Sequence, residues 1–331
     1  MRLKRVSRDD LAVRRVRKGR GYAYLDRDGG PWPAGELRER ALHLGIPPAW
    51  TEVRIAPQAN AHIQACGIDA AGRVQYIYHA DWEARRARKK DGQLILLATA
   101  LGRIRRRVNQ DLEAPAGSRE LALAIGVALI DRTAMRVGRE RYLDAHGTRG
   151  AGTLFTRDVS VKGDMLTVSF PAKSGKAASY TLKDARLAAA IAHVKTVPGK
   201  RLLMYRGEDE TPRAVRTEDL NRYLKDISDA SVTAKDFRTL HASALAAEAL
   251  AKIAPGESKT ARSRQINAVS RSVAAFLRNT PTIARKSYIA PCLFTLFESA
   301  KLPDLWAAAS PAHDGLRVRE AKLESVLQAV A

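Results

Sequence analysis

The sequence predicts an α+β protein: a small N-terminal antiparallel β-sheet domain, then a larger, mainly α-helical domain with a β-hairpin or three-stranded sheet. Short alternating segments separated by Gly and Asp turns fill roughly the first quarter of the chain, whereas helical patterns dominate the remainder. The 331 residues are 45% hydrophobic, which is enough for two cores. We therefore expect two domains, at residues 1–88 and 89–331.

The N-terminal domain is predicted from alternating segments and turns. Strands are expected at residues 22–25, 51–56, 62–67 and 73–78, with a short helix at about 35–44. Alternation in the last strand places Arg73 on one face and Tyr76 and Tyr78 on the other. These tyrosines fit either the domain core or a binding surface, and the pattern leaves both roles open.

A basic helical run, DWEARRARKKDG, begins at Asp81 and is expected to contain the domain linker, at residues 84–92. The run fits a solvated helix face. In a protein this basic, it equally fits the flank of a nucleic-acid channel.

The second domain is predicted to be helical with one β interruption. Helices are expected at 93–112, from an N-cap at Ser118 to about Gly138, and onward to a last helix at 315–330. Three short strands are expected between them, at 159–161, 166–170 and 177–182, joined by turns at 162–164 and 174–175.

The charge balance indicates the class of partner. Lys and Arg number 57 against 35 Asp and Glu, giving a net charge of +22 and a pI near 10.4. Nucleic acid is the usual partner of such a protein, because each phosphate that Lys or Arg neutralises releases a counterion. A ribosomal or membrane-surface protein is the alternative that composition leaves open.

Other sequence features argue against further ligands. Cys66 and Cys292 form neither a metal-binding spacing nor a disulfide framework, and the seven histidines are scattered. The KSGK segment at 173–176 lacks the glycine and hydroxyl residue of a phosphate loop. The N-terminus has no apolar signal core, and the run Leu121–Ile130 is too short to cross a bilayer. We expect a monomer in the cytoplasm, associated with the nucleoid, with no cofactor, metal, bound nucleotide or membrane contact.

Two basic residues stand out early in the helical domain. Arg136 is expected near the end of the helix that begins after Ser118, on its apolar face. An arginine there needs an anion, although a buried salt bridge is the alternative. Lys173 lies at the predicted hairpin turn beside Gly175, where a lysine can reach into a groove or simply lie in solvent.

The KDFR motif at 235–238 is a third candidate. Lys235 and Arg238 lie three residues apart and share a helical face, with Thr233 or Asp236 as the cap. A surface helix with ion pairs is the alternative.

The fourth candidate is NTPTIARKSY at 279–288. Thr280 followed by proline is a helix start, and Tyr288 follows two turns later. Arg285 and Lys286 surround this tyrosine with positive charge. A packed core tyrosine is the alternative.

Together and in this order, the motifs resemble the type IB DNA topoisomerases, especially their poxvirus-like bacterial branch. The resemblance covers nearly the whole chain and rests on IPPAW (46–50), HIQACGIDAAGR (62–73), QYIYH (75–79), RVGRERY (136–142), GTLFTRDV (152–159), AKSGK (172–176), TAKDFRT (233–239) and NTPTIARKSYIAP (279–291). It implies the catalytic fold shared by tyrosine recombinases and type IB topoisomerases, and duplex DNA as the partner.

The resemblance also implies a role for each catalytic residue. Tyr288 is expected to attack the phosphate and hold the 3′ end, while Arg136 and Arg238 clamp the non-bridging oxygens without a metal. Lys173 is expected to be the general acid for the 5′ oxygen, with Lys176 as its rival. Asn279 stands where many members carry His; an amide also donates a hydrogen bond but cannot titrate. The phosphotyrosyl bond stores the energy for religation, so ATP is not required.

Further DNA contacts are expected from basic and aromatic residues, with the N-terminal domain as a clamp on the duplex. They are Arg73, Tyr76, Tyr78, Arg139, Arg141, Tyr142, Lys176, Lys235, Arg285 and Lys286.

A tyrosine site-specific recombinase is the nearest alternative, because it uses the same nucleophile and fold. Recombinases usually carry HxxR at the second arginine, whereas Lys235 makes this motif KxxR. A β-rich N-terminal domain also disfavours a recombinase. A non-catalytic DNA-binding protein is the second alternative, and it predicts unchanged behaviour on Tyr288→Phe.

Overall fold

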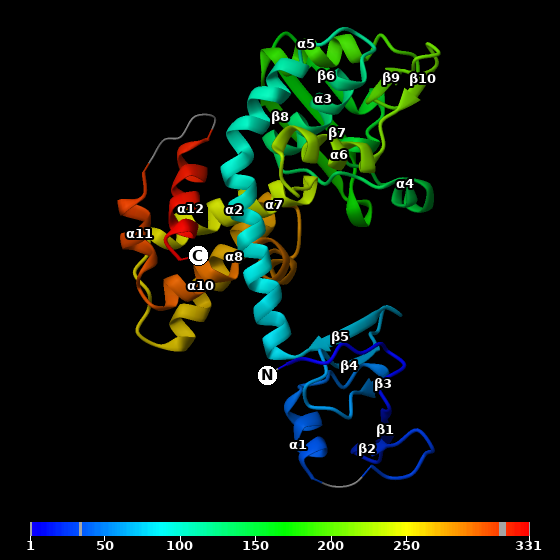
Figure 1. Ribbon diagram of the computed structural model, residues 1–331, viewed down its shortest axis with the longest axis vertical. Coiled ribbons are helices and arrows are strands. Elements are labelled where there is room, and N and C mark those ends of the chain that lie inside the picture. Colours follow the sequence, from blue (N-terminus) through cyan, green and yellow to red (C-terminus); the bar gives the residue numbers. More distant parts are fainter. Residues whose placement is uncertain (1, 33–34, 311–315, 331) are drawn as a thin grey trace. The chain divides into compact units, whose positions relative to one another are not determined.

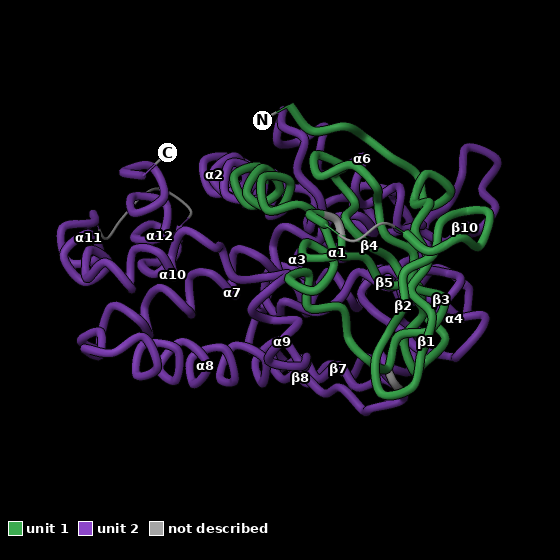
Figure 2. Tube along the Cα trace, turned by 90° about the horizontal axis from the view of Figure 1, so that it is seen from below, with its two compact units in different colours: residues 1–89 green, residues 90–331 purple. Residues whose placement is uncertain are grey.

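The computed structural model describes residues 2–32, 35–310 and 316–330 (Figure 1). The chain divides into two compact units, Met1–Lys89 and Lys90–Ala331 (Figure 2). The first contains an antiparallel sheet and the second is mainly helical with a small three-stranded sheet. The predicted α+β fold class is therefore confirmed.

The first unit is built on one antiparallel sheet of five strands. In the order β2-β1-β3-β4-β5, these are Gly21–Leu25, Val13–Lys18, Thr51–Ile55, Ile63–Ile68 and Val74–Tyr78. A helix, α1 (Glu36–His43), lies between β2 and β3 in the sequence. Small hydrophobic clusters cover both faces: Ile77 packs into one and Tyr78 into the other. Strand β1 escaped prediction because four of its six residues are basic, which hides the apolar alternation.

The expected linker at 84–92 is not a break in structure. Helix α2 is continuous from Ala80 to Asp111 and includes both the basic run and the helix expected from residue 93. The run is rich in Ala, Arg, Lys and Glu, which are strong helix formers, and it tolerates the single Gly92. The boundary between the two units therefore falls inside a helix.

The second unit is organised around two buried helices, α3 (Arg119–Thr133) and α7 (Ala234–Ala251). The N-cap predicted at Ser118 is confirmed, because its hydroxyl accepts from the Leu121 amide. Helix α7 packs against α3, α6 (Thr217–Ser228), α8 (Lys259–Phe276), α10 (Pro291–Glu298), α11 (Leu302–Ala308) and α12 (Val318–Gln328). The last helix, whose partner the sequence left open, thus packs on α7 and α11.

The predicted three-stranded sheet is present, in the order β6-β7-β8: Val159–Lys162, Met165–Pro171 and Ala177–Lys183. Strand β7 alternates buried and exposed residues, so one face covers the core. Helix α5 (Ala185–Val194) packs on β6 and β7, and helix α4 (Glu140–His146) precedes the sheet in the chain. A second small sheet, β9 (Met204–Arg206) with β10 (Pro212–Ala214), was not predicted; each strand has only three residues, too few to show a period.

No helix in the described parts of the chain combines the length and apolar character that crossing a membrane requires.

Candidate active site

Arg238 is held in the core of the second unit by two main-chain carbonyls. Helix α7 begins with a capping box in which the Asp236 carboxylate accepts from the Thr233 amide at 2.8 Å. This places Arg238 on the second turn, with 3% of its surface exposed. Its guanidinium donates to the carbonyl of Ala134, and to that of Leu277 at 3.0 Å. Its buried Nε has no hydrogen-bond partner within the described residues, so one donor of a charged group is unsatisfied there.

The structure corrects the expected placement of Arg136. Helix α3 ends at Thr133, because Ala134 adopts a left-handed conformation with φ of 53°. Arg136 therefore lies in the segment after the helix rather than on its apolar face. The turn at Ala134 serves the site directly, since it presents the carbonyl that Arg238 binds.

The two arginines bind consecutive carbonyls at the end of α8. Arg238 donates to Leu277, and Arg136 Nη2 donates to the carbonyl of Arg278 at 3.3 Å. Burial, then the charge of Arg238, lowers the pKa of Arg136, whereas Tyr288 acts in the opposite direction. Two positive groups thus share a site that contains no carboxylate among these contacts, an arrangement suited to an anion.

The main chain at Arg136 is fixed by a close glycine contact. The carbonyl of Arg136 accepts from the Ala151 amide at 2.9 Å. Gly150 allows this approach, because a Cβ there would lie 2.3 Å from the Arg136 oxygen and 2.5 Å from the Gly138 nitrogen. Both neighbours are main-chain atoms, so a side chain at 150 would displace Arg136.

Tyr288 ends a single turn of π-helix. The helix start at Thr280 is confirmed: its hydroxyl accepts from the Ile283 amide, and α9 covers Pro281–Ile283. The next residues, Ala284–Tyr288, widen into a π turn rather than the α-helical turns expected. The Tyr288 ring is half-buried, and the Arg238 guanidinium carbon lies 4.9 Å from the ring centroid.

Two consecutive peptide groups after Tyr288 are bound by side chains. Ser243 Oγ of α7 donates to the Tyr288 carbonyl at 3.2 Å and accepts from the Ala290 amide at 2.9 Å. Lys90 Nζ of α2 donates to the Ile289 carbonyl at 2.7 Å. Neither residue stands out in the sequence, because Lys90 lies within a run with many charges and Ser243 belongs to no motif.

Asn279 lies directly after the two carbonyls that bind the arginines. Its Oδ1 accepts from the Thr280 amide at 3.2 Å, which leaves the side-chain NH₂ as a donor. Arg278, which the sequence analysis overlooked, adopts a left-handed φ of 50° and donates to the Ser179 carbonyl at 2.5 Å. Its guanidinium also lies 4.9 Å from the Tyr180 ring centroid. Arg278 thereby ties strand β8 to the segment whose carbonyls Arg136 and Arg238 bind.

Lys173 and Lys176 lie on the turn between β7 and β8, as expected. Both are exposed, and the Ala172 amide closes the turn by donating to the Lys176 carbonyl at 2.8 Å. Ser179, which Arg278 binds, is three residues beyond this turn. Within the described chain, no hydrogen bond or ion pair joins Lys173 to Arg136, Arg238 or Tyr288. The turn is thus linked to the site through β8 and Arg278, whereas the Lys173 ammonium itself makes no such bond with these three residues of the described chain.

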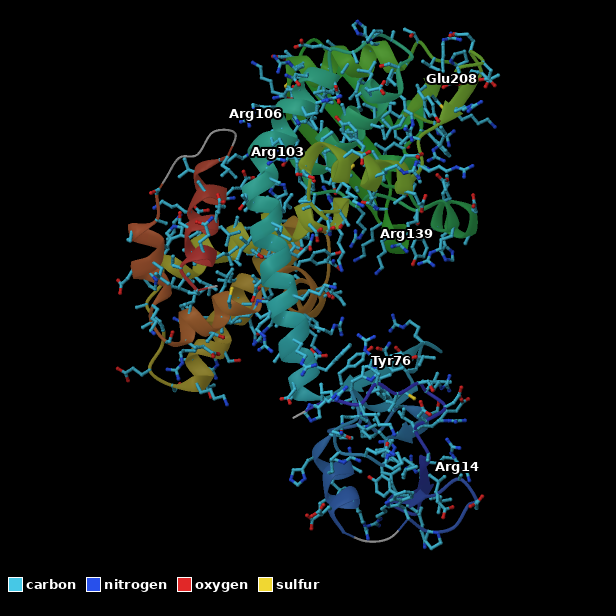
Figure 3. All side chains as sticks on the ribbon, viewed as in Figure 1. Arg14, Tyr76, Arg103, Arg106, Arg139 and Glu208 are labelled. Atoms are coloured by element: carbon cyan, nitrogen blue, oxygen red, sulfur yellow. The ribbon has the colours of Figure 1, made fainter. Side chains whose placement is uncertain are left out.

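The predicted DNA contacts near Arg136 lie on and before α4. Arg139 is exposed in the segment leading into this helix (Figure 3). Arg141 donates to the Tyr142 hydroxyl at 3.0 Å and covers its ring, and both side chains are exposed. A stacked arginine and tyrosine at an exposed position can contact a phosphate and a base or sugar together.

Three more predicted contacts lie around the segment that contains Tyr288. Lys235 and Lys286 are exposed, the former on the first turn of α7. Arg285 instead donates to Asn267 Oδ1 at 2.9 Å and lies over the Phe294 ring. These contacts tie Arg285 to α8 and α10 and restrict its reach towards DNA.

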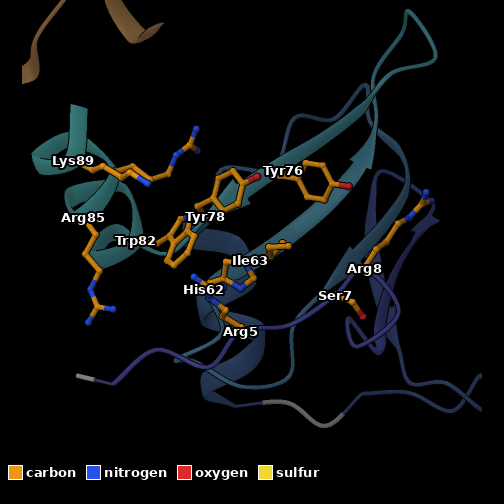
Figure 4. Close-up of a pocket in the computed structure, with 11 residues that line it drawn as sticks. Arg5, Ser7, Arg8, His62, Ile63, Tyr76, Tyr78, Trp82, Arg85 and Lys89 are labelled. Atoms are coloured by element: carbon orange, nitrogen blue, oxygen red, sulfur yellow. The ribbon is translucent and has the colours of Figure 1, made fainter. Parts of the chain in front are cut away.

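The first unit contains a basic and aromatic groove of about 820 Å³ (Figure 4). Tyr76 and Tyr78 of β5 line it, with ring centroids 6.0 Å apart. Tyr78 also packs into a hydrophobic cluster, whereas Tyr76 is exposed. Arg73 lies outside the groove and pairs with Asp69 at 2.8 Å. Basic residues not predicted as contacts also line the groove: Arg5, Arg8, Arg85, Arg86 and Lys89.

A buried charge network joins four helices of the second unit. Arg105 of α2 binds Asp131 of α3 at 2.8 Å and Glu320 of α12 at 2.7 Å. His241 of α7 lies between the same two carboxylates, 3.5 Å from Asp131. Burial alone would raise the pKa of Asp131, but His241 and Arg105 hold it far below its ordinary value.

The histidines are scattered in the sequence, but in the structure His241 lies beside two carboxylates. His241 and the two carboxylates form a set that could ligate a metal. Arg105 already supplies the positive charge between them. Sequence spacing missed this set because His241, Asp131 and Glu320 come from three distant segments.

Comparison with known proteins agrees with this architecture. A family model of the eukaryotic DNA topoisomerase I catalytic core matches residues 80–291. A model of the bacterial DNA topoisomerase IB N-terminal domain matches residues 21–69.

Two viral proteins illustrate the similarity. DNA topoisomerase 1B of Acanthamoeba polyphaga mimivirus is 28% identical over 295 residues, covering 87% of this chain and 88% of that protein. DNA topoisomerase 1B of vaccinia virus strain Copenhagen is 25% identical over 145 residues, covering 43% of this chain and 45% of that protein. Because the catalytic-core model spans more than half of the chain, the protein belongs to the type IB DNA topoisomerase family, and its N-terminal match places it in the bacterial branch.

Proposed function

We propose that this topoisomerase relaxes supercoiled duplex DNA by cleaving one strand through Tyr288. The phenolic oxygen forms a bond to the phosphorus, and the bond from phosphorus to the 5′ oxygen breaks. The 3′ end is then held as a phosphotyrosyl ester while the 5′-hydroxyl strand rotates and later attacks the ester in reverse. Because the ester conserves the phosphodiester bond energy, the cycle requires no ATP.

The geometry of Arg238 is the observation that carries this proposal. Its guanidinium is buried, is fixed by two carbonyls, and lies beside the Tyr288 ring with its Nε unsatisfied within the described chain. A buried donor of this kind costs free energy unless an anion completes it. A phosphate that Tyr288 attacks supplies that anion and gains stabilisation as charge develops in the transition state.

Arg136 and Asn279 complete the proposed binding of the phosphoryl oxygens. Arg136 reaches the carbonyl next to the one that Arg238 binds, so both guanidinium groups are available to the same phosphate. The Asn279 NH₂ adds a neutral donor. We propose that these groups stabilise the negative charge directly and that a metal ion is not required.

Lys173 is proposed as the general acid that protonates the departing 5′ oxygen. Its support is its place on a turn that β8 and Arg278 hold near the site. Lys176 lies on the same turn and is equally exposed, so it remains the rival.

Both proposed domains, 1–88 and 89–331, are assigned contacts to the duplex, and the enzyme is proposed to act as a monomer. In the second, the proposed contacts are Arg139, Arg141, Tyr142, Lys176, Lys235, Arg285 and Lys286. In the first, they are Tyr76 and Tyr78 of the basic groove, and Arg73 outside it. Sugar and phosphate contacts of this kind give affinity that falls steeply with salt.

Plasmid relaxation in a chelating buffer without ATP tests the proposed function. Wild type should relax the plasmid, and Tyr288→Phe should not, while still binding duplex DNA. Strand exchange between two defined sites, with no relaxation, would instead support a recombinase.

A further inference from the structure

The lysine that binds the main chain beside Tyr288 is unusual in its surroundings. Lys90 is half-buried on α2, and its ammonium donates to the Ile289 carbonyl at 2.7 Å. Lysine is seldom buried unless a specific partner compensates for lost hydration. The hydrogen bond to the Ile289 carbonyl, one residue after Tyr288, is therefore the specific contact that compensates Lys90 for its lost hydration.

We infer that Lys90 is a positioning residue for Tyr288: by binding the Ile289 carbonyl, it helps to fix the Ile289–Ala290 peptide, and through it the end of the π turn that carries the Tyr288 ring beside Arg238. This inference rests on the proposed role of Tyr288. Lys90 does not touch the ring itself in this account; it acts through the main chain.

The conformation of the main chain at residues 288–290 explains why the hydrogen bond from Lys90 to Ile289 matters. The π turn ends at Tyr288, and Ile289 is already extended, with φ of −82° and ψ of 134°. Ser243 binds the groups on either side, the Tyr288 carbonyl and the Ala290 amide. The Ile289 carbonyl between them is bound by Lys90 alone among the described side chains. Ser243 holds the amide edge of the Ile289–Ala290 peptide and Lys90 holds its carbonyl edge. Without Lys90, this peptide is held from one edge only and rotates more freely about Ile289, which moves the end of the π turn.

The charged groups around Lys90 come from three helices. Burial lowers the pKa of Lys90 to about 8, with Asp91 of α2 opposing this shift and Lys235 of α7 adding to it. Cys292 of α10 is also near, and burial followed by the charge of Asp91 raises its thiol pKa to about 12. The thiol therefore stays neutral, and the protonation of Lys90 changes within the ordinary assay range.

A pH dependence follows from this. Below pH 8 an ammonium binds the Ile289 carbonyl with charge assistance, and above it a neutral amine donates a weaker bond. An arginine in place of Lys90 keeps its charge throughout. The ratio of wild-type to Lys90→Arg cleavage rates should therefore fall as the pH rises through about 8.

Single-turnover cleavage of a suicide duplex, with DNA affinity and thermal unfolding measured in parallel, tests the inference. Lys90→Met should form the covalent adduct between about tenfold and 10²-fold more slowly at unchanged DNA affinity, as small misplacements of reacting groups do. Lys90→Arg should restore most of the rate at pH 7. Lys195→Met is the matched control, because Lys195 also donates to a main-chain carbonyl, that of Val159, and burial lowers its pKa as well. It should cleave at the wild-type rate.

Equal adduct rates for Lys90→Met and Lys195→Met would overturn the inference, as would a rate ratio of wild type to Lys90→Arg that is flat from pH 6.5 to 9.5 (about three units around the pKa). The pH ratio decides the matter if Lys90→Met does not fold. Tyr288→Phe distinguishes a failure of the proposed function from a failure of the inference about Lys90. If that variant still forms an adduct, the proposed function fails; if it is inert while Lys90→Met is unimpaired, only this inference fails.

Discussion

The guanidinium carbon of Arg238 lies 4.9 Å from the centroid of the Tyr288 ring, although the two residues are fifty positions apart in the sequence. Helix α7 carries the arginine, and a π turn ends on the tyrosine. The contact joins a permanent positive charge to the proposed nucleophile, and it requires the carbonyls of Ala134 and Leu277 to hold the guanidinium in place.

Arg238→Lys should slow adduct formation by about 10² to 10³ while leaving DNA affinity nearly unchanged. An ammonium cannot span the two carbonyls and still donate to a phosphoryl oxygen, because it lacks the planar fork. Single-turnover cleavage measures the effect. Arg103→Lys serves as the control, since Arg103 also donates to a main-chain carbonyl, that of Ser228. A cleavage rate within threefold of wild type would contradict the clamp role (roughly 0.6 kcal/mol in the barrier).

Gly150→Ala should reduce cleavage on the order of tenfold without removing any chemical group from the site. The new Cβ would overlap the Arg136 carbonyl oxygen at 2.3 Å, so the segment that carries Arg136 must shift. Overpacking of this kind should also cost about 1 to 3 kcal/mol of stability, measurable by urea unfolding. Gly21→Ala is the control, because its nearest neighbour is 3.9 Å away. Wild-type kinetics for Gly150→Ala would show that the Arg136 backbone does not depend on this contact.

Lys173→Ala and Lys176→Ala should differ on a substrate with a 5′-phosphorothiolate at the cleavage site. A thiolate leaves without a proton, so the variant that lacks the general acid regains its rate on this substrate. We expect rescue of Lys173→Ala and none of Lys176→Ala. Rescue of the second alone would assign the acid to Lys176.

Asp131→Asn should destabilise the second unit by about 3 kcal/mol or more at pH 7, because it breaks a buried pair and leaves Arg105 only partly compensated. The folded-state pKa of Asp131 lies below its unfolded value of about 3.9, so its contribution is present above that value and is lost as the pH falls. The difference between wild type and variant in urea unfolding should therefore shrink below about pH 4.

Asp209→Asn is the matched control for that measurement. Arg213 binds this carboxylate too, at 2.9 Å, but both side chains are about half exposed, so the change in stability should be far smaller. A constant difference between wild type and Asp131→Asn from pH 7 to pH 3 would contradict the assigned pKa direction.

The sequence predicted the parts of the fold that depend on local pattern. The Ser118 cap, the strands around residues 159–182 and the start at Thr280 all follow from capping and alternation, and all are present. The motif residues Arg238 and Tyr288 were likewise found from resemblance, and the structure places them in contact.

What the sequence could not predict depends on distant partners. Ala134 has no preference for a left-handed conformation, yet it ends α3 there and presents its carbonyl to Arg238. The prediction that Arg136 lies on this helix was therefore wrong, because the helix ends at Thr133. In the sequence, Lys90 cannot be told from its solvated neighbours, because its partner Ile289 lies 199 residues away. In each case, a contact with another segment of the chain outweighs the preference of the local sequence.

The proposed mechanism depends on a covalent bond between Tyr288 and DNA. Suicide duplex should be incubated with the protein in chelating buffer without ATP, and the adduct digested and mapped by mass spectrometry. We expect a nucleotide linked through its 3′ phosphate to the peptide containing Tyr288, and no adduct from Tyr288→Phe. An adduct on any other residue, or one that survives Tyr288→Phe, would contradict it.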